Sequence, residues 1–394
     1  MPNADRHLEI WPVGFRTYNL LVPNLLNLPA SLLGVGAPKQ LVGLAMYESS
    51  RAADCGYCTA HSCSFGLRRG TSGAALAGKY ETDVEAAVAQ VAEGLGTVPA
   101  TLTAEDVAEL ERHLSPAQVE WIALAIATMG FLNMFMDAMG IELEAEAIAV
   151  ATDIIGPTSW TPGKHRPTDE TGAAATDERP ETAPAVPKDG LATYLRVLRL
   201  APGAIRLERR WTRGVPRRID AAQALLRDQV GCSFSTLDRA RNPRVVRALT
   251  TVLRDNLDAD RSVVGLRSKC LAGLVLTERV DNPRLASDVA ALTEAVAPDL
   301  TDIDRRRIAT FALTDQWDER AGTPQLDAGL DDFESAVMVL ARAASTSPAI
   351  VDDAVIATVT EHLDPAQIVE VLVWLSVLQM LHRLETFHRV RESR

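Results

Sequence analysis

The chain has 394 residues, of which 47% are apolar and 23% charged, and its formal net charge is −12. This length exceeds what one hydrophobic core usually holds, so two domains are expected. The composition is that of a soluble globular protein, and the negative charge disfavours nucleic acid and an anionic membrane as main partners.

The chain begins with a polar segment, residues 1–7, that lacks the apolar core of a secretory signal. We therefore expect a cytoplasmic protein, whose thiols stay reduced unless they turn over. The five cysteines are an odd number, and Cys55, Cys58 and Cys63 fall within nine residues. Such a cluster is typical of a redox or metal site rather than of a disulfide framework.

The segment Cys55-Gly56-Tyr57-Cys58-Thr59-Ala60-His61 carries this chemistry. Asp54 is a suitable N-cap and Gly70 a suitable helix end, which predicts a helix over about residues 55–69. Cys55 and Cys58 then share one face of its first turn. The free backbone N–H groups and the positive helix dipole stabilise a thiolate at this position.

Two further side chains are candidates for moving protons near the sulfurs. His61 lies one turn beyond Cys58, so its imidazole can reach the sulfur directly or through a water. Glu48 lies seven residues before Cys55, on the same face if the helix is continuous. A break at Asp54 would change that geometry.

The sequence next shows an internal repeat. Residues 83–119 match residues 332–368 without a gap, at a constant offset of 249. In both copies a helix with proline at its first position is expected, beginning at Pro116 and Pro365. A looser match places Cys55–Cys58 on Cys232–Ser235, followed by about seventy extra residues. We predict a duplicated protein.

Two further segments have a distinctive composition. The apolar stretch 121–136 is too short for a comfortable span of a bilayer about 30 Å thick, so we expect a buried core helix. Residues 156–190 hold six prolines, which indicates a linker or a lid, and a plain solvated linker is the favoured interpretation. No sustained strand alternation occurs, so the prediction is all-α, with domains at 1–155 and 191–394.

A Cys-x-x-Cys with a following His and a preceding Glu, in a helical chain, resembles the alkylhydroperoxidase D and carboxymuconolactone decarboxylase family. Tyr57 and the segment from Ala60 to Phe65 add to the likeness. The resemblance covers about residues 36–144 well, whereas the second copy matches the family only in a degraded form. The family's His usually stands where this chain has Ser62, and its Glu where this chain has Gly43.

The resemblance implies a thiol-dependent peroxidase. Cys58 would attack a hydroperoxide and become a sulfenic acid, Cys55 would resolve it as a disulfide, and His61 and Glu48 would relay protons. Electrons would come from an external dithiol reductant, with no bound organic cofactor. Single-domain relatives form oligomers, so a homo-oligomer, dimer or trimer, is expected.

Several alternatives stay open at this stage. A zinc site could use Cys55, Cys58, His61 and Cys63, but one helix separates Cys55 from His61 by about 9 Å along its axis. A lyase like the lactone decarboxylases would need no dithiol, and a redox-responsive assembly protein would need no turnover. Packing alone is the expected role of Cys63, and also of the lone thiols Cys232 and Cys270.

The second copy is expected to be inactive. In the looser match, Ser235 replaces Cys58 and Asp238 stands where His61 would be. Neither a disulfide nor a thiolate attack is possible with those residues, which predicts a structural half.

Overall fold

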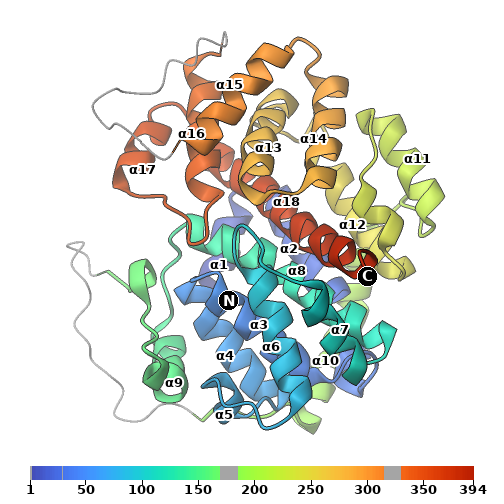
Figure 1. Cartoon of the computed structure of the whole chain (residues 1–394), viewed down its shortest axis with the longest axis vertical. Coiled ribbons are helices and arrows are strands. Elements are labelled where there is room, and N and C mark those ends of the chain that lie inside the picture. Colours follow the sequence, from blue (N-terminus) through green and yellow to red (C-terminus); the bar gives the residue numbers. More distant parts are fainter. Residues whose placement is uncertain (1, 29, 169–184, 315–329) are drawn as a thin grey trace.

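The computed structural model describes residues 2–28, 30–168, 185–314 and 330–394, and within these ranges the fold is all-α (Figure 1). Helices alternate with loops and short 3-10 turns, and no β-strand occurs in the described parts of the chain. The predicted fold class is confirmed.

Within the described residues, the first half of the chain contributes nine α-helices: α1 Pro2–Glu9, α2 Pro12–Leu25, α3 Lys39–Ala52, α4 Gly56–Arg69, α5 Gly73–Leu76, α6 Asp83–Gly96, α7 Ala104–His113, α8 Pro116–Ala138 and α9 Ala145–Ile155. The second half contributes α10 Leu191–Trp211, α11 Ile219–Val230, α12 Pro243–Asn256, α13 Leu266–Val280, α14 Pro283–Val296, α15 Asp302–Leu313, α16 Asp332–Ala344, α17 Asp353–Thr360 and α18 Pro365–Glu392.

Helices α8 and α18 pack against each other through the middle of the molecule (Figure 1). Both begin with a capping box and a proline at the first turn, from Ser115 and Asp364 respectively. Both are long and apolar enough to cross a membrane, yet 94% and 78% of their most apolar windows are buried inside the protein. They are core helices of one continuous hydrophobic cluster shared by the two halves. The expectation of a buried helix at 121–136 is confirmed.

Helix boundaries recur along the chain. The first residues of α6, α7 and α8 stand 249 positions before those of α16, α17 and α18. Helix α13 packs on α14, α16 and α18 as α3 packs on α4, α6 and α8. These correspondences agree with the predicted repeat, although duplication itself stays a prediction.

The structure corrects the looser part of the alignment. Cys232 precedes only the short 3-10 helix η4, Ser235–Arg239. The counterpart of α3 and α4 is instead α13 and α14, at an offset of 227: Asp281 repeats the positive φ of Asp54, and Asn282 repeats the N-cap role of Cys55. By this alignment the second copy carries 22 extra residues rather than about seventy, and they fall between α14 and α16, where α15 lies.

The structure of the first part of the proline-rich segment also differs from the favoured prediction. Residues 156–168 hold two short 3-10 helices, η2 Gly156–Thr158 and η3 Gly163–His165, and fold back over the start of α4. Trp160 packs against the core and His165 is buried. A plain solvated linker is the wrong interpretation of these residues, because they are tied to the core. Residues 169–184 lie outside the described part of the chain.

Candidate functional site

The two cysteines of the motif meet at the start of α4. The chain turns between α3 and α4 through Asp54, whose φ is +52°, so Cys55 and not Asp54 becomes the N-cap. The Cys58 backbone N–H donates to Cys55 Sγ over 3.3 Å. Both side chains are buried free thiols. The predicted helix is confirmed, with Gly70 in the left-handed conformation at its end.

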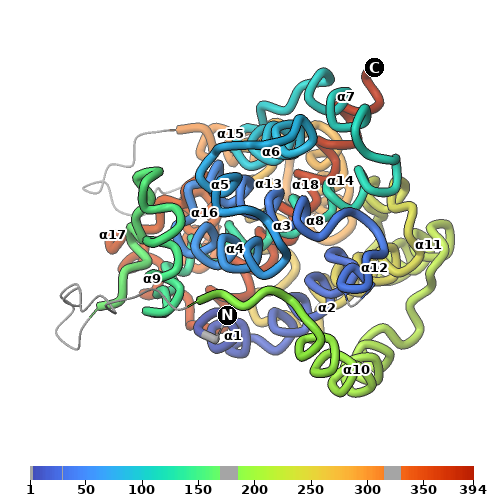
Figure 2. Tube along the Cα trace, turned by 90° about the horizontal axis from the view of Figure 1, so that it is seen from below, coloured from blue at the N-terminus to red at the C-terminus, as the bar shows by residue number. Residues whose placement is uncertain are grey.

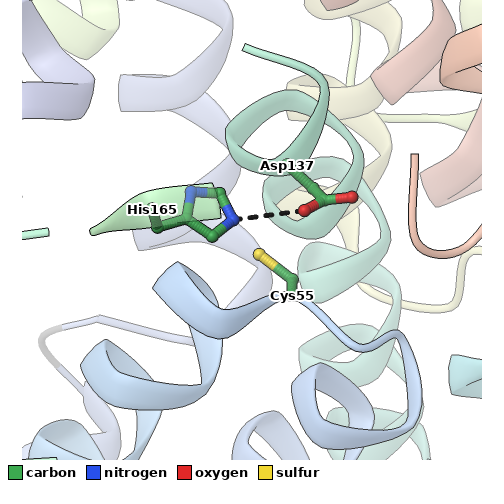
Figure 3. A group of neighbouring side chains, drawn as sticks. All are labelled: Cys55, Asp137 and His165. Atoms are coloured by element: carbon green, nitrogen blue, oxygen red, sulfur yellow. Dashed lines mark hydrogen bonds and ion pairs between the residues drawn. The ribbon is translucent and has the colours of Figure 1, made fainter. Parts of the chain in front are cut away.

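Cys55 faces two residues that the motif did not reveal (Figure 3). Asp137 comes from the last turn of α8, and His165 comes from η3. His165 Nε2 lies 3.1 Å from Asp137 Oδ1, and its Nδ1 lies 2.8 Å from the Ile141 carbonyl oxygen. One side-chain atom each of Cys55, Asp137 and His165 lies within 4.8 Å of the other two. Because a carbonyl oxygen only accepts, Nδ1 carries a proton, and Nε2 faces the carboxylate and the sulfur.

This arrangement favours an ion pair between Cys55 and His165. Burial raises the pKa of the Cys55 thiol, but hydrogen bonds from Cys58 and His165 outweigh it and bring that pKa down to about 7. Burial lowers the pKa of His165, but bonds to Asp137 and Cys55 raise it to about 9. Between these two values a thiolate faces an imidazolium. Burial and the neighbouring Cys55 sulfur raise the pKa of Cys58.

Asp137 is held from both halves of the chain. Its Oδ1 lies 3.1 Å from Lys164 Nζ, and its Oδ2 accepts from the Ala349 backbone N–H. Lys164 Nζ also donates to the Ala349 carbonyl over 2.7 Å. In the same loop, Ser347 Oγ donates to the Ala53 carbonyl, at the turn between α3 and α4. The loop before α17 is therefore part of the site.

Cys58 and His61 line one cavity of about 470 Å³. Its wall is mostly apolar and comes from α2, α3, α4, α8 and α9, including Val22, Leu26, Met46, Phe65, Met129 and Val150. Residues 185–187, at the end of the proline-rich segment, close one side, and Asp189 pairs with Arg69 at the end of α4. Such a cavity suits a hydrophobic small molecule, and the Cys58 side chain lies on its wall.

The partner of His61 is Glu144. His61 Nε2 lies 2.7 Å from Glu144 Oε2, and the Tyr57 ring packs against the imidazole at 4.5 Å between centroids, tilted by 46°. Burial raises the pKa of Glu144, but the hydrogen bond and charge of His61 lower it to about 2. This pair therefore places an orienting carboxylate and an imidazole on the cavity wall.

The structure does not bring Glu48 to the sulfurs. Its Oε2 accepts from Arg51 Nε over 2.7 Å, and its Oε1 accepts from the Tyr80 hydroxyl over 2.9 Å. Burial raises its pKa. No described contact of Glu48 reaches Cys55, Cys58 or His61, because the break at Asp54 turns α4 away from the face of α3 that carries Glu48. The expectation of a Glu48 relay is replaced by Glu144 on His61.

The site could offer metal ligands, but not the predicted ones. His61 faces Glu144, so it does not join Cys55 and Cys63 in one set. Cys55, Asp137 and His165 lie close enough to share an ion. A tetrahedral zinc needs a fourth ligand, for which Cys58 is the nearest sulfur. The Lys164 ammonium on Asp137 and the charge on His165 already balance the anionic groups, which disfavours a dication there.

The remaining cysteines fit packing roles. Cys63, Cys232 and Cys270 are buried, and burial raises their pKa values to about 12, 11 and 11. At the counterpart position on α14, Leu285 stands in place of Cys58 and Asp288 in place of His61. The described second half therefore has no dithiol.

Comparison with protein-family models, with curated proteins and with solved structures finds no match to this chain. The resemblance to the alkylhydroperoxidase D and carboxymuconolactone decarboxylase family therefore stays a prediction from the motif.

The sequence alone did not indicate a site role for Asp137, Glu144 or His165, and the reason differs for each. Asp137 could have been recognised as a candidate, because it is a charged residue at the end of a strongly apolar run. Glu144 lies in a short acidic segment, and nothing local connects it with His61, 83 positions earlier. His165 lay among prolines, and nothing local connects it with Cys55, 110 positions earlier.

Proposed function

We propose that this protein is a thiol-dependent oxidoreductase that reduces a hydroperoxide through a dithiol–disulfide cycle of Cys55 and Cys58. The observation that carries the proposal is that the two sulfurs have different surroundings. Cys58 lines an apolar cavity beside His61, and Cys55 lies behind it against the imidazolium of His165. A buried, cation-stabilised thiolate next to a thiol on the cavity wall suits two-electron reduction.

In the first step the Cys58 sulfur attacks the outer oxygen of the hydroperoxide. The S–O bond forms and the O–O bond breaks, so Cys58 becomes a sulfenic acid. The Cys58 thiol proton passes to the Cys55 thiolate, to which it is hydrogen-bonded. The leaving alkoxide takes a proton from His61, which Glu144 orients, and departs as an alcohol.

In the second step Cys55 attacks the Cys58 sulfur. The S–S bond forms, the S–O bond breaks, and hydroxide leaves with the Cys55 proton as water. The peroxide has then gained two electrons and the dithiol has lost two. An external dithiol reductant restores the thiols by exchange, which requires a reducing compartment such as the cytoplasm.

The test is thiol-trapping mass spectrometry after one equivalent of an organic hydroperoxide. We expect a disulfide between Cys55 and Cys58 in the wild type, a sulfenic acid on Cys58 in Cys55→Ser, and no turnover in Cys58→Ser. Cys270→Ser, a buried thiol in the second half, is the matched control and should behave as wild type. Equal peroxide turnover by wild type and Cys58→Ser would end the proposal.

We also propose that the protein is a homo-oligomer that assembles through α10. This helix has no buried residue, and six of its large apolar side chains are between 41% and 73% exposed: Leu191, Leu195, Leu198, Leu200, Ile205 and Leu207. It lies at the edge of the molecule (Figure 2). Helix α10 carries five arginines and one glutamate, a net +4, whereas the rest of the chain carries −16. A second, acidic copy of the chain therefore complements it in charge, while two α10 helices would repel each other.

A further inference from the structure

Arg383 is a buried cation from the second half of the chain, and within the described residues its direct hydrogen bonds go to the first half. It lies on α18 and is 1% exposed. Its Nη1 donates to Ser49 Oγ over 2.6 Å and to the Ile126 carbonyl over 3.2 Å, and its Nη2 donates to the Gly96 carbonyl over 3.0 Å. All three acceptors are uncharged.

A guanidinium in this setting needs an anion nearby, because burying an unpaired charge is strongly unfavourable. No carboxylate forms an ion pair with Arg383 within the described ranges. The groups whose charge acts on it are the two sulfurs of Cys55 and Cys58. Burial lowers the pKa of Arg383 to about 10, so it keeps its charge at neutral pH.

A small cavity connects Arg383 with the rest of the site. It has a volume of about 20 Å³ and is lined by Arg383, Gln379, Asn133 and Asp137, among others. Three buried atoms on these residues lack a hydrogen-bond partner: Arg383 Nε, Gln379 Oε1 and Asn133 Oδ1. The volume suits one water molecule, which would accept from Nε and donate to the two amide oxygens. This water would fix the guanidinium beside Asp137, which contacts His165 and Lys164.

We infer that Arg383, held by one buried water between Gln379 and Asn133, is a positioning residue that supplies the counter-charge for the dithiol anion. The inference rests on the dithiol of the proposed function and extends it. The charged groups around the sulfurs are then His165 and Lys164 from η3, Asp137 from α8 and Arg383 from α18. The second half is not only a structural partner, since the thiol site is electrostatically incomplete without it.

The test is the pH titration of the thiolate by its ultraviolet absorbance, which needs no peroxide. Arg383→Gln keeps a hydrogen-bond donor for Ser49 and removes the charge. We expect the midpoint of thiolate formation to rise by about one pH unit, which from a midpoint near 7 is a roughly fivefold loss of thiolate at pH 7. Arg383→Lys, which keeps the charge, should retain most of the wild-type midpoint. Arg389→Gln, an exposed arginine on the same helix, should leave it unchanged.

If Arg383→Gln does not fold, Gly130→Ala provides a second route. A Cβ at Gly130 would lie 2.9 Å from Arg383 Cδ and would push the flexible side chain out of place, so the midpoint should again rise. An unchanged midpoint in a folded Arg383→Gln variant would overturn the inference. If only Gly130→Ala folds, an unchanged midpoint in that variant would overturn it. Failure of the proposed function is a separate result, because turnover by Cys58→Ser can persist while Arg383 still shifts the thiol pKa.

Discussion

At the scale of single residues, the site depends on how two similar thiols are made different. Cys55 is the helix N-cap and accepts the Cys58 N–H, and it contacts the imidazolium of His165. Cys58 sits one turn further along and lines the cavity. The same helix turn therefore holds one sulfur whose negative charge is stabilised and one sulfur that lines the cavity.

His165 should control the ionisation of Cys55. His165→Gln removes the positive charge, so the pKa of Cys55 should rise from about 7 toward its ordinary value of 9. A rise of about one unit, seen in the ultraviolet titration of the thiolate, is a roughly fivefold loss of thiolate at pH 7, and the full rise to 9 is a roughly fiftyfold loss. His113→Gln, on the half-exposed end of α7, is the control. An identical titration curve in His165→Gln would contradict this role.

The same pKa values predict the pH dependence of peroxide reduction. As pH falls through about 7 the Cys55 thiolate is protonated, and as pH rises through about 9 His165 loses its charge. The rate of sulfenic acid formation should therefore be highest between these values, in a bell-shaped profile. In His165→Gln the alkaline limb should disappear. A rate that rises steadily beyond pH 9 in the wild type would be inconsistent with the ion pair.

At the scale of elements, the strap of residues 162–165 must come close to the start of α4. Gly56 makes this approach possible, because a Cβ there would lie 2.8 Å from the Pro162 carbonyl oxygen. The oxygen belongs to the backbone and cannot rotate away. Any larger residue at position 56 therefore displaces the strap that carries His165.

Gly56→Ala should for this reason raise the thiol pKa without altering any ionisable group. Alanine is the better helix former by up to about 1 kcal/mol, so on propensity alone the variant would be more stable. We expect the reverse: a lower melting temperature and a higher midpoint for the thiolate. Gly73→Ala is the matched control, since a Cβ there meets only Ile154 Cγ2 at 3.9 Å. An unshifted titration in Gly56→Ala would show that the strap tolerates the contact.

At the scale of the whole molecule, the two halves build one site. Arg383 and the loop of Ser347 and Ala349 come from the second half, and the sulfurs come from the first. The apolar face that still lacks a partner is that of α10. It lies on the outside of the molecule and is the surface through which we expect copies to associate.

Light scattering after size-exclusion chromatography tests this assembly. The wild type should have the mass of a dimer or trimer, and the double variant Leu195→Glu with Leu198→Glu should be a monomer. Both side chains are exposed, so the fold should be unaffected. Leu313→Glu, an equally exposed leucine at the end of α15, should keep the oligomer. A monomeric wild type would exclude assembly through α10.

What the sequence alone determined is local. Caps, prolines and glycines placed both ends of α4 to within a residue and the starts of α8 and α18, since these signals act within a few residues. The spacing of Cys55, Cys58 and His61 likewise put them at one end of one helix. The repeat at offset 249 was visible because it is ungapped, whereas the pairing of Cys55 with Cys232 was wrong, because that stretch has too few shared residues to decide the alignment.

Only the tertiary structure decided the chemistry around the sulfurs. Asp137, His165 and Arg383 reach Cys55 and Cys58 from 79 to 328 positions along the chain, and no pattern in the sequence expresses those approaches. The pKa of a thiol depends on burial and on charges within a few ångströms, whichever segments supply them. Glu48 shows the converse: it is near in sequence, but one left-handed residue at Asp54 directs it to Arg51 and Tyr80 instead.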